Sequence, residues 1–272
     1  MPASAFLPLG AEVLQRRCVI AYDGSRFQGF QAQERGEAMR TGQVVAFVSK
    51  CTAEDRVFRD ALNNRLPEDV LCRRMTRTDH RSGDNGPSLL LFDPRAHSKR
   101  KTYKYVIVNC GLRPVFDRNR TWFVKKPLDV TKMNAAIAFF LEEPTAKDYS
   151  SFTPQKAAAG DEHGNVCTIT SIRIIDEPIK QDQSHLQIDT DDDANDGPDT
   201  TNLDASRKLE IVFQGDRFLY KMVRNLVGTL VDVGLGRIAP ESIPLILQAK
   251  NRGKAGQGAP PQGLTLMHIE YE

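Results

Sequence analysis

The sequence predicts an α+β fold in which largely antiparallel sheets are flanked by helices. Short segments of alternating or uninterrupted apolar residues, bounded by Gly, Pro and Asp, recur along the chain and are typical of strands. Four longer segments repeat apolar residues every three or four positions, as amphipathic helices do. Helices and strands do not alternate strictly, which argues against a parallel βαβ sheet. Both halves of the 272-residue chain show this mixture, so we predict two similar domains, residues 16–110 and 111–272.

The strand segments differ in their expected burial. CVIAY ends in an Asp-Gly turn, whereas KTYKYVIVNC alternates and then becomes wholly apolar, the pattern of a half-buried sheet. The predicted strands are 18–22, 42–50, 71–75, 88–93, 101–110, 167–177, 209–215 and 264–272.

Each helical segment carries one apolar face. Residues 216–234 form the strongest pattern, with Leu219, Met222, Leu226 and Leu230 on a single stripe. The predicted helices are 53–66, 130–143, 216–234 and 241–250.

The composition excludes several classes of protein. No apolar run approaches the roughly 20 residues that cross a bilayer, and the first residues lack the cationic start and apolar block of a secretion signal. The five cysteines are scattered without a CxxC pair, which indicates a reducing, intracellular location and no zinc site. His80 lies near Asp79 and Asp84, but such a loose loop cluster is more often solvated than metal-binding. We therefore predict no metal site.

The charge is unevenly distributed. Residues 181–205 contain eight Asp and no Lys or Arg, and the remaining body carries 37 basic against 27 acidic residues. The acidic segment has few apolar anchors, so we predict a disordered loop there. A basic body suits a polyanionic partner such as nucleic acid, although a solvated, mildly basic surface accounts for it equally well.

Two side chains stand out from these patterns. In the helix predicted over 216–234, Arg217, Lys221 and Arg224 follow one another at steps of three or four beside the apolar stripe. A partly buried guanidinium cannot lose its charge and needs a carboxylate or phosphate partner; an exposed Arg on an amphipathic helix is the alternative for Arg224. In KTYKY, Tyr103 shares a strand face with Tyr105.

Cations surround these tyrosines. An aromatic ring beside cations can stack an unpaired base and hold its phosphates, whereas the alternative is a pair of core tyrosines at a basic strand end. The cations of this region are Arg95, Lys99, Arg100 and Lys101.

Eight sequence blocks in a fixed order resemble the tRNA pseudouridine synthase A (TruA) family. The resemblance covers nearly the whole chain from Arg17 to the C-terminus, apart from the acidic segment. The blocks are YDGSRFQGFQAQ, GQVVAF, LNNRLPEDV, FDPRAHSKRKTYKYVIVN, LRP, DYSSF, RFLYKMVRNLVGTLVDVG and GLTLMHIEY.

The resemblance implies a fold and a reaction. The family has two similar α+β halves that face each other across a basic cleft, forms homodimers, and isomerises selected uridines of tRNA to pseudouridine without a metal or organic cofactor. The target nucleotide is turned out of its stack. By this resemblance Tyr103 packs against the flipped base, and Arg224 pairs with the aspartate nucleophile, whose pKa it lowers. Arg95, Lys99, Arg100, Lys101, Arg217 and Lys221 are then expected to line the path of the RNA phosphates.

The nucleophile segment itself is missing. The family carries its aspartate in a GRTDAGVHA-like segment just before the strand that matches GQVVAF, and here GFQAQ passes through ERGEAMRT directly into that strand. A helix and a strand that normally precede the motif are also absent. Such a loss is expected to leave unpaired backbone and an incomplete core in the first domain.

No other carboxylate is a convincing replacement. RTDH at 77–80 resembles the motif core but follows the LPEDV block and lacks the AGVH continuation. Asp93 precedes a matched Arg and is expected to serve structure, Asp23 is expected to cap a turn, and Asp60 lies on a helix without a surrounding motif.

Three explanations follow: a splice variant or gene model that lacks an exon, a catalytically silent RNA-binding relative, or catalysis by an unusual carboxylate. A structural or protein-interaction role without RNA affinity is a further class of function.

Overall fold

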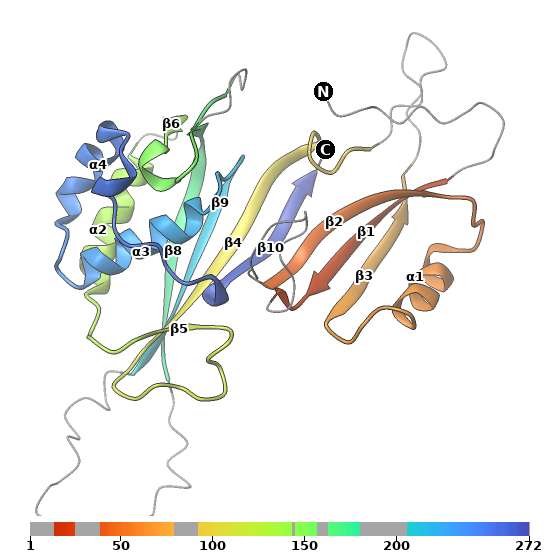
Figure 1. The fold of residues 1–272 in the computed structure, drawn as a ribbon, viewed down its shortest axis with the longest axis horizontal. Helices are drawn as coiled ribbons and strands as arrows, with labels where there is room; N and C mark the ends of the chain where they lie inside the picture. Colours follow the sequence, from red (N-terminus) through yellow and green to blue (C-terminus); the bar gives the residue numbers. More distant parts are fainter. Residues whose placement is uncertain are drawn as a thin grey trace, which may run out of the picture.

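The computed structural model describes residues 14–24, 39–78, 92–142, 145–156, 163–179 and 206–271. Within them, one mixed sheet of eight strands runs through both halves of the chain (Figure 1). Its order is β3-β1-β2-β10-β4-β9-β8, with β5 attached to β4. The strands are β1 (Leu14–Tyr22), β2 (Met39–Ser49), β3 (Val70–Arg77), β4 (Ser98–Asn109), β5 (Trp122–Val124), β8 (Ile169–Pro178), β9 (Arg207–Gly215) and β10 (Leu264–Tyr271).

The predicted α+β class is confirmed. All strand pairs of the large sheet are antiparallel except β10 with β2 and β4 with β5. A second, two-stranded sheet joins β6 (Lys147–Asp148) to β7 (Val166–Cys167). The helices are α1 (Asp55–Asn63), α2 (Val130–Leu141), α3 (Met222–Gly234) and α4 (Ile243–Ala249). The predicted strand at 88–93 and the acidic segment 181–205 fall largely or wholly outside the described residues.

The two halves differ in the size of their cores. In the C-terminal half, α2, α3 and α4 pack with β4, β8 and β9 around a large cluster that includes Tyr105, Phe213 and Leu226, all fully buried. In the N-terminal half, the buried cluster consists of Cys18, Cys72 and Met75. None of the α1 side chains is buried. The division of the chain into domains at residue 110 stays a prediction, and β4 contributes Tyr105 to the C-terminal core.

The sheet is weakly joined at its centre. β2 pairs with β1 along nearly its whole length, but with β10 only at Met39 and Arg40, opposite Thr265 and Leu266. Beyond this crossing the two strands diverge (Figure 1). A Cβ at Gly42 would overlap the carbonyl oxygen of Met267, so the close crossing requires glycine there. Much of one edge of β2 therefore has no strand partner among the described residues.

The helix predicted over 216–234 begins only at Met222, so its N-terminal boundary was wrong. Lys221 adopts a left-handed conformation with φ of 58°, which an α-helix cannot include. Phe218, upstream of this residue, packs its ring against Tyr103. Arg217 and Lys221 consequently precede the helix, and the line of cations expected beside Arg224 does not exist in that form.

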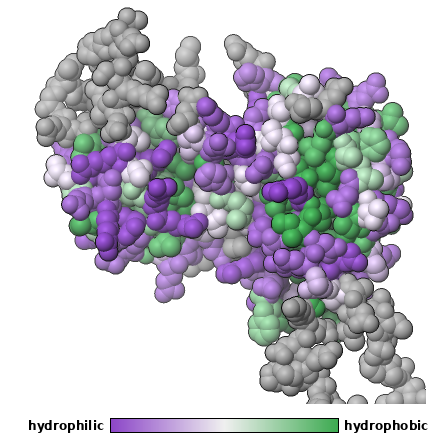
Figure 2. All heavy atoms as spheres, turned by 180° about the vertical axis from the view of Figure 1, so that it is seen from behind, coloured by the Kyte–Doolittle hydropathy of each residue, from purple (hydrophilic) through white to green (hydrophobic). Residues whose placement is uncertain are grey.

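Seen from behind, the described surface of the N-terminal half is mostly hydrophilic, whereas hydrophobic residues gather on the C-terminal half (Figure 2). Large apolar side chains that remain exposed in that half include Leu112, Val115 and Phe116, which precede β5.

Candidate functional site

Tyr103 lies in the middle of β4, between β9 and β10. It is opposite Phe213 on one side and Leu266 on the other. Its ring is partly buried and meets the edge of Phe218 at a centroid distance of 5.1 Å and an angle of 76°. This aromatic contact fixes the orientation of the Tyr103 ring.

Arg224 and Tyr105 are held by neighbouring carbonyl groups of one loop. Arg224 Nε donates a hydrogen bond to the Ala259 carbonyl at 2.7 Å, and Tyr105 Oη donates to the Pro260 carbonyl at 2.7 Å. The Ala259 amide in turn donates to the Arg224 carbonyl. Burial raises the pKa of Tyr105 well above its usual range, while the Arg224 charge acts in the opposite direction.

The loop between α4 and β10 needs its glycines to reach this position. A Cβ at Gly263 would lie 2.6 Å from the Tyr105 ring, and one at Gly258 would lie 2.9 Å from the Asn225 side chain. Asn225 is buried and donates to the Phe152 carbonyl, which ties the start of α3 to the DYSSF block. The glycines and prolines of AGQGAPPQG, residues 255–263, indicate a loop that can approach other residues closely. We did not predict a site from this pattern.

Tyr103 and Arg224 share one layer of the structure. Tyr103 and Tyr105 alternate with Lys104 along β4 and so face the same side of the sheet, where α3 packs. Tyr103 contacts Phe218, just before α3, and Tyr105 lies close enough to Arg224 for the charge to act on its phenol. The roles predicted for Tyr103 and Arg224 remain predictions.

Arg224 has no acidic partner in the described part of the chain. It is half-buried, and its one hydrogen bond uses Nε, so within those residues its two terminal nitrogens have no protein acceptor. A half-buried guanidinium of this kind favours an anionic partner.

The cations predicted to line an RNA path come from two segments that the sheet brings together. Lys101 lies opposite Gly215, two residues before Arg217, so both segments meet at one end of the sheet. Lys99 and Arg100 are exposed on the same strand, Arg100 lies 3.6 Å from Glu270, and Arg217 Nη2 donates to the Gly164 carbonyl. The remaining two, Arg95 and Lys221, are exposed.

The acidic side chains considered as replacements take structural positions. Asp93 accepts hydrogen bonds from the amides of Arg95 and Ala96 and so caps a turn. Asp60 pairs with its neighbour Arg59 on the exposed face of α1. The RTDH segment leaves the described region after Thr78, and the His80 cluster lies outside it.

Helices cover a largely antiparallel sheet, and cationic segments meet at one end of that sheet. This arrangement defines an α+β class suited to polyanionic ligands. Comparison with known proteins is more specific. The model of the tRNA pseudouridine synthase family matches residues 146–272. The chain is 30% identical to a tRNA pseudouridine synthase A 1 of Bacillus cereus, over 94% of this chain and 98% of that protein. It therefore belongs to the tRNA pseudouridine synthase A family.

Two further relatives agree. The tRNA pseudouridine synthases A of Pseudothermotoga lettingae and Acetivibrio thermocellus are each 28% identical to this chain and are covered over 98% of their length. The alignment with the Bacillus cereus protein spans 285 positions, more than the 272 residues of this chain. That relative therefore contains residues without a counterpart here.

Proposed function

We propose that this chain is by descent a tRNA pseudouridine synthase that binds tRNA, and that it lacks the aspartate nucleophile of the isomerisation. Membership of the family supports the substrate and the reaction class. In the complete reaction, a carboxylate acts as nucleophile while the N-glycosidic bond of uridine breaks, and the base is rejoined to the ribose through carbon. Uridine and pseudouridine are isomers, so no co-reactant is consumed.

The observation that carries the proposal is that, among the described residues, the guanidinium of Arg224 has no carboxylate partner. By the family resemblance we expect a carboxylate beside this arginine, whereas the only acceptor of its guanidinium among the described residues is the Ala259 carbonyl. The weakly joined sheet supports the same conclusion, because β2 pairs with β10 at only two positions, and the loss of a strand is expected to leave such an unpaired edge. The Bacillus cereus relative contains residues without a counterpart in this chain, as expected if this chain has lost a segment.

The residues present retain the functions of binding and positioning. Tyr103, fixed by Phe218, offers a ring against a uracil base. Lys101 and Arg217 lie on adjoining strand ends, where phosphates of a bound RNA can reach them. We further propose that the chain forms a homodimer, from the resemblance, and that it works inside the cell, from its scattered cysteines. Its five cysteines are free thiols, and no helix of the described residues is long and apolar enough to span a membrane.

The test uses tRNA tritiated at carbon 5 of uridine, because pseudouridine formation releases this tritium. We expect no release above the protein-free background, together with salt-dependent binding of the same tRNA. Tritium release that is lost in Tyr103→Phe would show that another carboxylate acts and that the chain is an enzyme as it stands. Absence of salt-dependent tRNA binding would contradict the proposal and favour a purely structural role. Sedimentation of the full chain at several concentrations tests the homodimer.

Catalysis by an unusual carboxylate remains the second candidate. Asp93→Ala distinguishes it, because Asp93 is the described acid nearest in sequence to the KTYKY block. Since Asp93 caps a turn, Asp93→Asn is the matched control, which preserves an oxygen acceptor for the Arg95 amide. Release that survives in neither variant would identify Asp93 as the nucleophile.

A further inference from the structure

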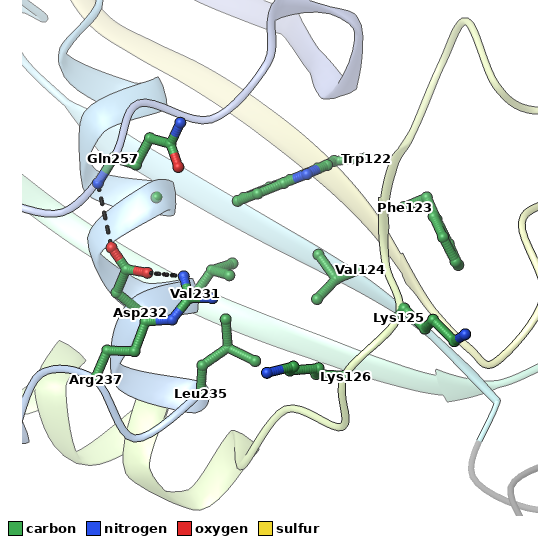
Figure 3. A pocket seen from close by; sticks show the side chains of 11 residues that line it. Trp122, Phe123, Val124, Lys125, Lys126, Val231, Asp232, Leu235, Arg237 and Gln257 are labelled. Atoms are coloured by element: carbon green, nitrogen blue, oxygen red, sulfur yellow. Dashed lines mark hydrogen bonds and ion pairs between the residues drawn. The ribbon is translucent and has the colours of Figure 1, made fainter.

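A cavity of about 260 Å³ lies between the C-terminal part of α3 and β5 (Figure 3). Its walls come from β5 and the two following residues, from α3, and from the loop at Gln257. Asp232 in this cavity lies eight residues after Arg224 on the same helix, or about 12 Å along its axis at 1.5 Å per residue. Gly228, which also lines the cavity, is four residues after Arg224, or about 6 Å along the axis, so the cavity adjoins the site of Tyr103 and Arg224 but includes neither side chain in its lining.

The inner walls are apolar and carry one large aromatic ring. Val124 and Val231 are buried beneath the cavity, and Leu235 lies beside them. Trp122 is half-buried, and its ring meets Tyr105 edge-on at 6.2 Å and 86°. Because Tyr105 is itself fully buried, this contact holds the indole in place with part of its surface toward the cavity (Figure 3).

Polar groups are placed around this apolar floor. Asp232 accepts a hydrogen bond from Arg237 Nη1 at 2.8 Å and another from the Gln257 amide at 3.2 Å. A Cβ at Gly228 would overlap the Gln257 carbonyl, so the loop lies directly on the helix. The Gln257 side chain is exposed near Trp122 and offers both a donor and an acceptor (Figure 3).

The cations at the rim are available to a ligand. Lys126 is exposed on the cavity side, and its ammonium group has no hydrogen-bond or ion-pair partner in the described structure. Lys125, likewise without such a partner among the described residues, extends away from the cavity (Figure 3). The segment that leads into the cavity, 113–126, contains five Lys or Arg and one Asp. This composition favours an anionic ligand.

We propose that this cavity binds one unpaired nucleotide of an RNA, with the base against Trp122 and its phosphate beside Lys126. A cavity with an apolar floor and a fixed ring can accept a base by stacking, and the side-chain amide of Gln257 can bond to polar atoms of a base edge. The volume is at or below the smallest usual ligand pockets, which admits a single ring system. The inference rests on the proposed RNA-binding function but concerns a second contact, beside the C-terminal part of α3 and distinct from the residues proposed to hold the flipped uridine.

Trp122 is the sole tryptophan of the chain, so its fluorescence reports directly on this cavity. The probe is a single-stranded oligouridylate of about ten nucleotides, within the usual site sizes for single strands, titrated into the full-length protein at low salt. We expect saturable quenching of Trp122. Lys126→Gln should weaken the titration about fivefold, whereas the matched control Lys125→Gln, which removes the same charge from a side chain that extends away from the cavity, should change it less than about twofold.

A second measurement does not depend on tryptophan emission. With a 3′-labelled oligonucleotide followed by anisotropy, Trp122→Leu should lower the affinity about tenfold, and Trp122→Phe, which keeps a ring against Tyr105, should restore most of it. Circular dichroism shows whether each variant is folded.

The outcomes separate this inference from the proposed function. If labelled tRNA binds but Trp122 is not quenched, or if Lys126→Gln and Lys125→Gln behave alike, the cavity is not a nucleotide site while the proposed function stands. If neither tRNA nor the oligonucleotide binds, both are wrong. Quenching by an acidic peptide in place of the oligonucleotide would assign the cavity to a protein partner and overturn the inference.

Discussion

Arg224 and Tyr105 donate to adjacent carbonyl groups, those of Ala259 and Pro260, at 2.7 Å each. The loop that provides both acceptors follows α4 and leads into β10, the strand next to β4. One loop thus positions a guanidinium from the helix and a phenol from the sheet. Within the described residues the terminal nitrogens of Arg224 have no acceptor, and the family resemblance predicts a carboxylate partner for them.

Replacement of the absent segment should restore catalysis. We expect a chimera that carries the corresponding segment of a Bacillus cereus relative between Gln33 and Gly42 to release tritium from tRNA labelled at uridine carbon 5, because Arg224 and Tyr103 are already present. The same chimera with Asp→Asn in the grafted segment is the control and should be inactive. An inactive but folded chimera would mean that Arg224 or Tyr103 is wrongly placed.

The free edge of β2 should exchange its amide hydrogens rapidly. β9 is paired on both sides, with β4 and with β8, whereas most of β2 is paired only with β1 among the described strands. Native-state hydrogen exchange should therefore show Val44–Phe47 opening at a lower free energy than Leu209–Phe213. Equal protection of the two segments would mean that another strand covers β2.

The buried cation Arg16 should make Asp55 important for stability. Arg16 is 0% exposed, lies 4.8 Å from the Phe58 ring centroid and pairs with Asp55 at 3.1 Å. Asp55→Asn leaves this charge buried without its carboxylate, and we expect a loss of about 3 kcal/mol in urea unfolding. The exposed pair Arg59–Asp60 is the control on the same helix, and Asp60→Asn should change stability by less than about 0.5 kcal/mol. Similar losses in both variants would contradict a special role for Asp55.

Stability should fall at alkaline pH. Burial raises the pKa of the Cys18 thiol from 9.0 to about 12, and burial raises the pKa of Tyr105 as well. The folded protein then retains protons that the unfolded chain has lost, so the stabilisation is complete below about pH 9 and is lost as the pH rises toward 12. Each group contributes a slope of at most about 1.4 kcal/mol per pH unit.

Cys18→Ala should reduce that slope between about pH 9 and 11, as measured by urea unfolding at each pH. Cys51, which is only partly buried, supplies the matched control Cys51→Ala. If the slope of Cys18→Ala equals that of the unmodified chain, the Cys18 thiol does not titrate with unfolding.

Sequence patterns predicted the element types because they depend on local spacing. The alternation in KTYKYVIVNC predicts a strand with one buried face, and the stripe of Leu226 and Leu230 predicts a helix with one buried face. In the structure, β4 and α3 bury these faces in the same core. The start of α3 was predicted too early, because the spacing of apolar residues before Met222 also fits a helix. In the structure, Phe218 instead contacts Tyr103, and Lys221 adopts a left-handed conformation that ends the helix on that side.

Residue order alone was enough to establish the α+β class, the family and the absence of the nucleophile motif, because each of these is a property of the linear chain. The folded chain was needed to show that Lys101 and Arg217 meet at one sheet end, that one loop holds both Arg224 and Tyr105, and that Trp122 borders a cavity beside α3. Those relationships join residues far apart along the chain. They arise from strand register and from the close approach of a glycine-rich loop, which local spacing does not encode.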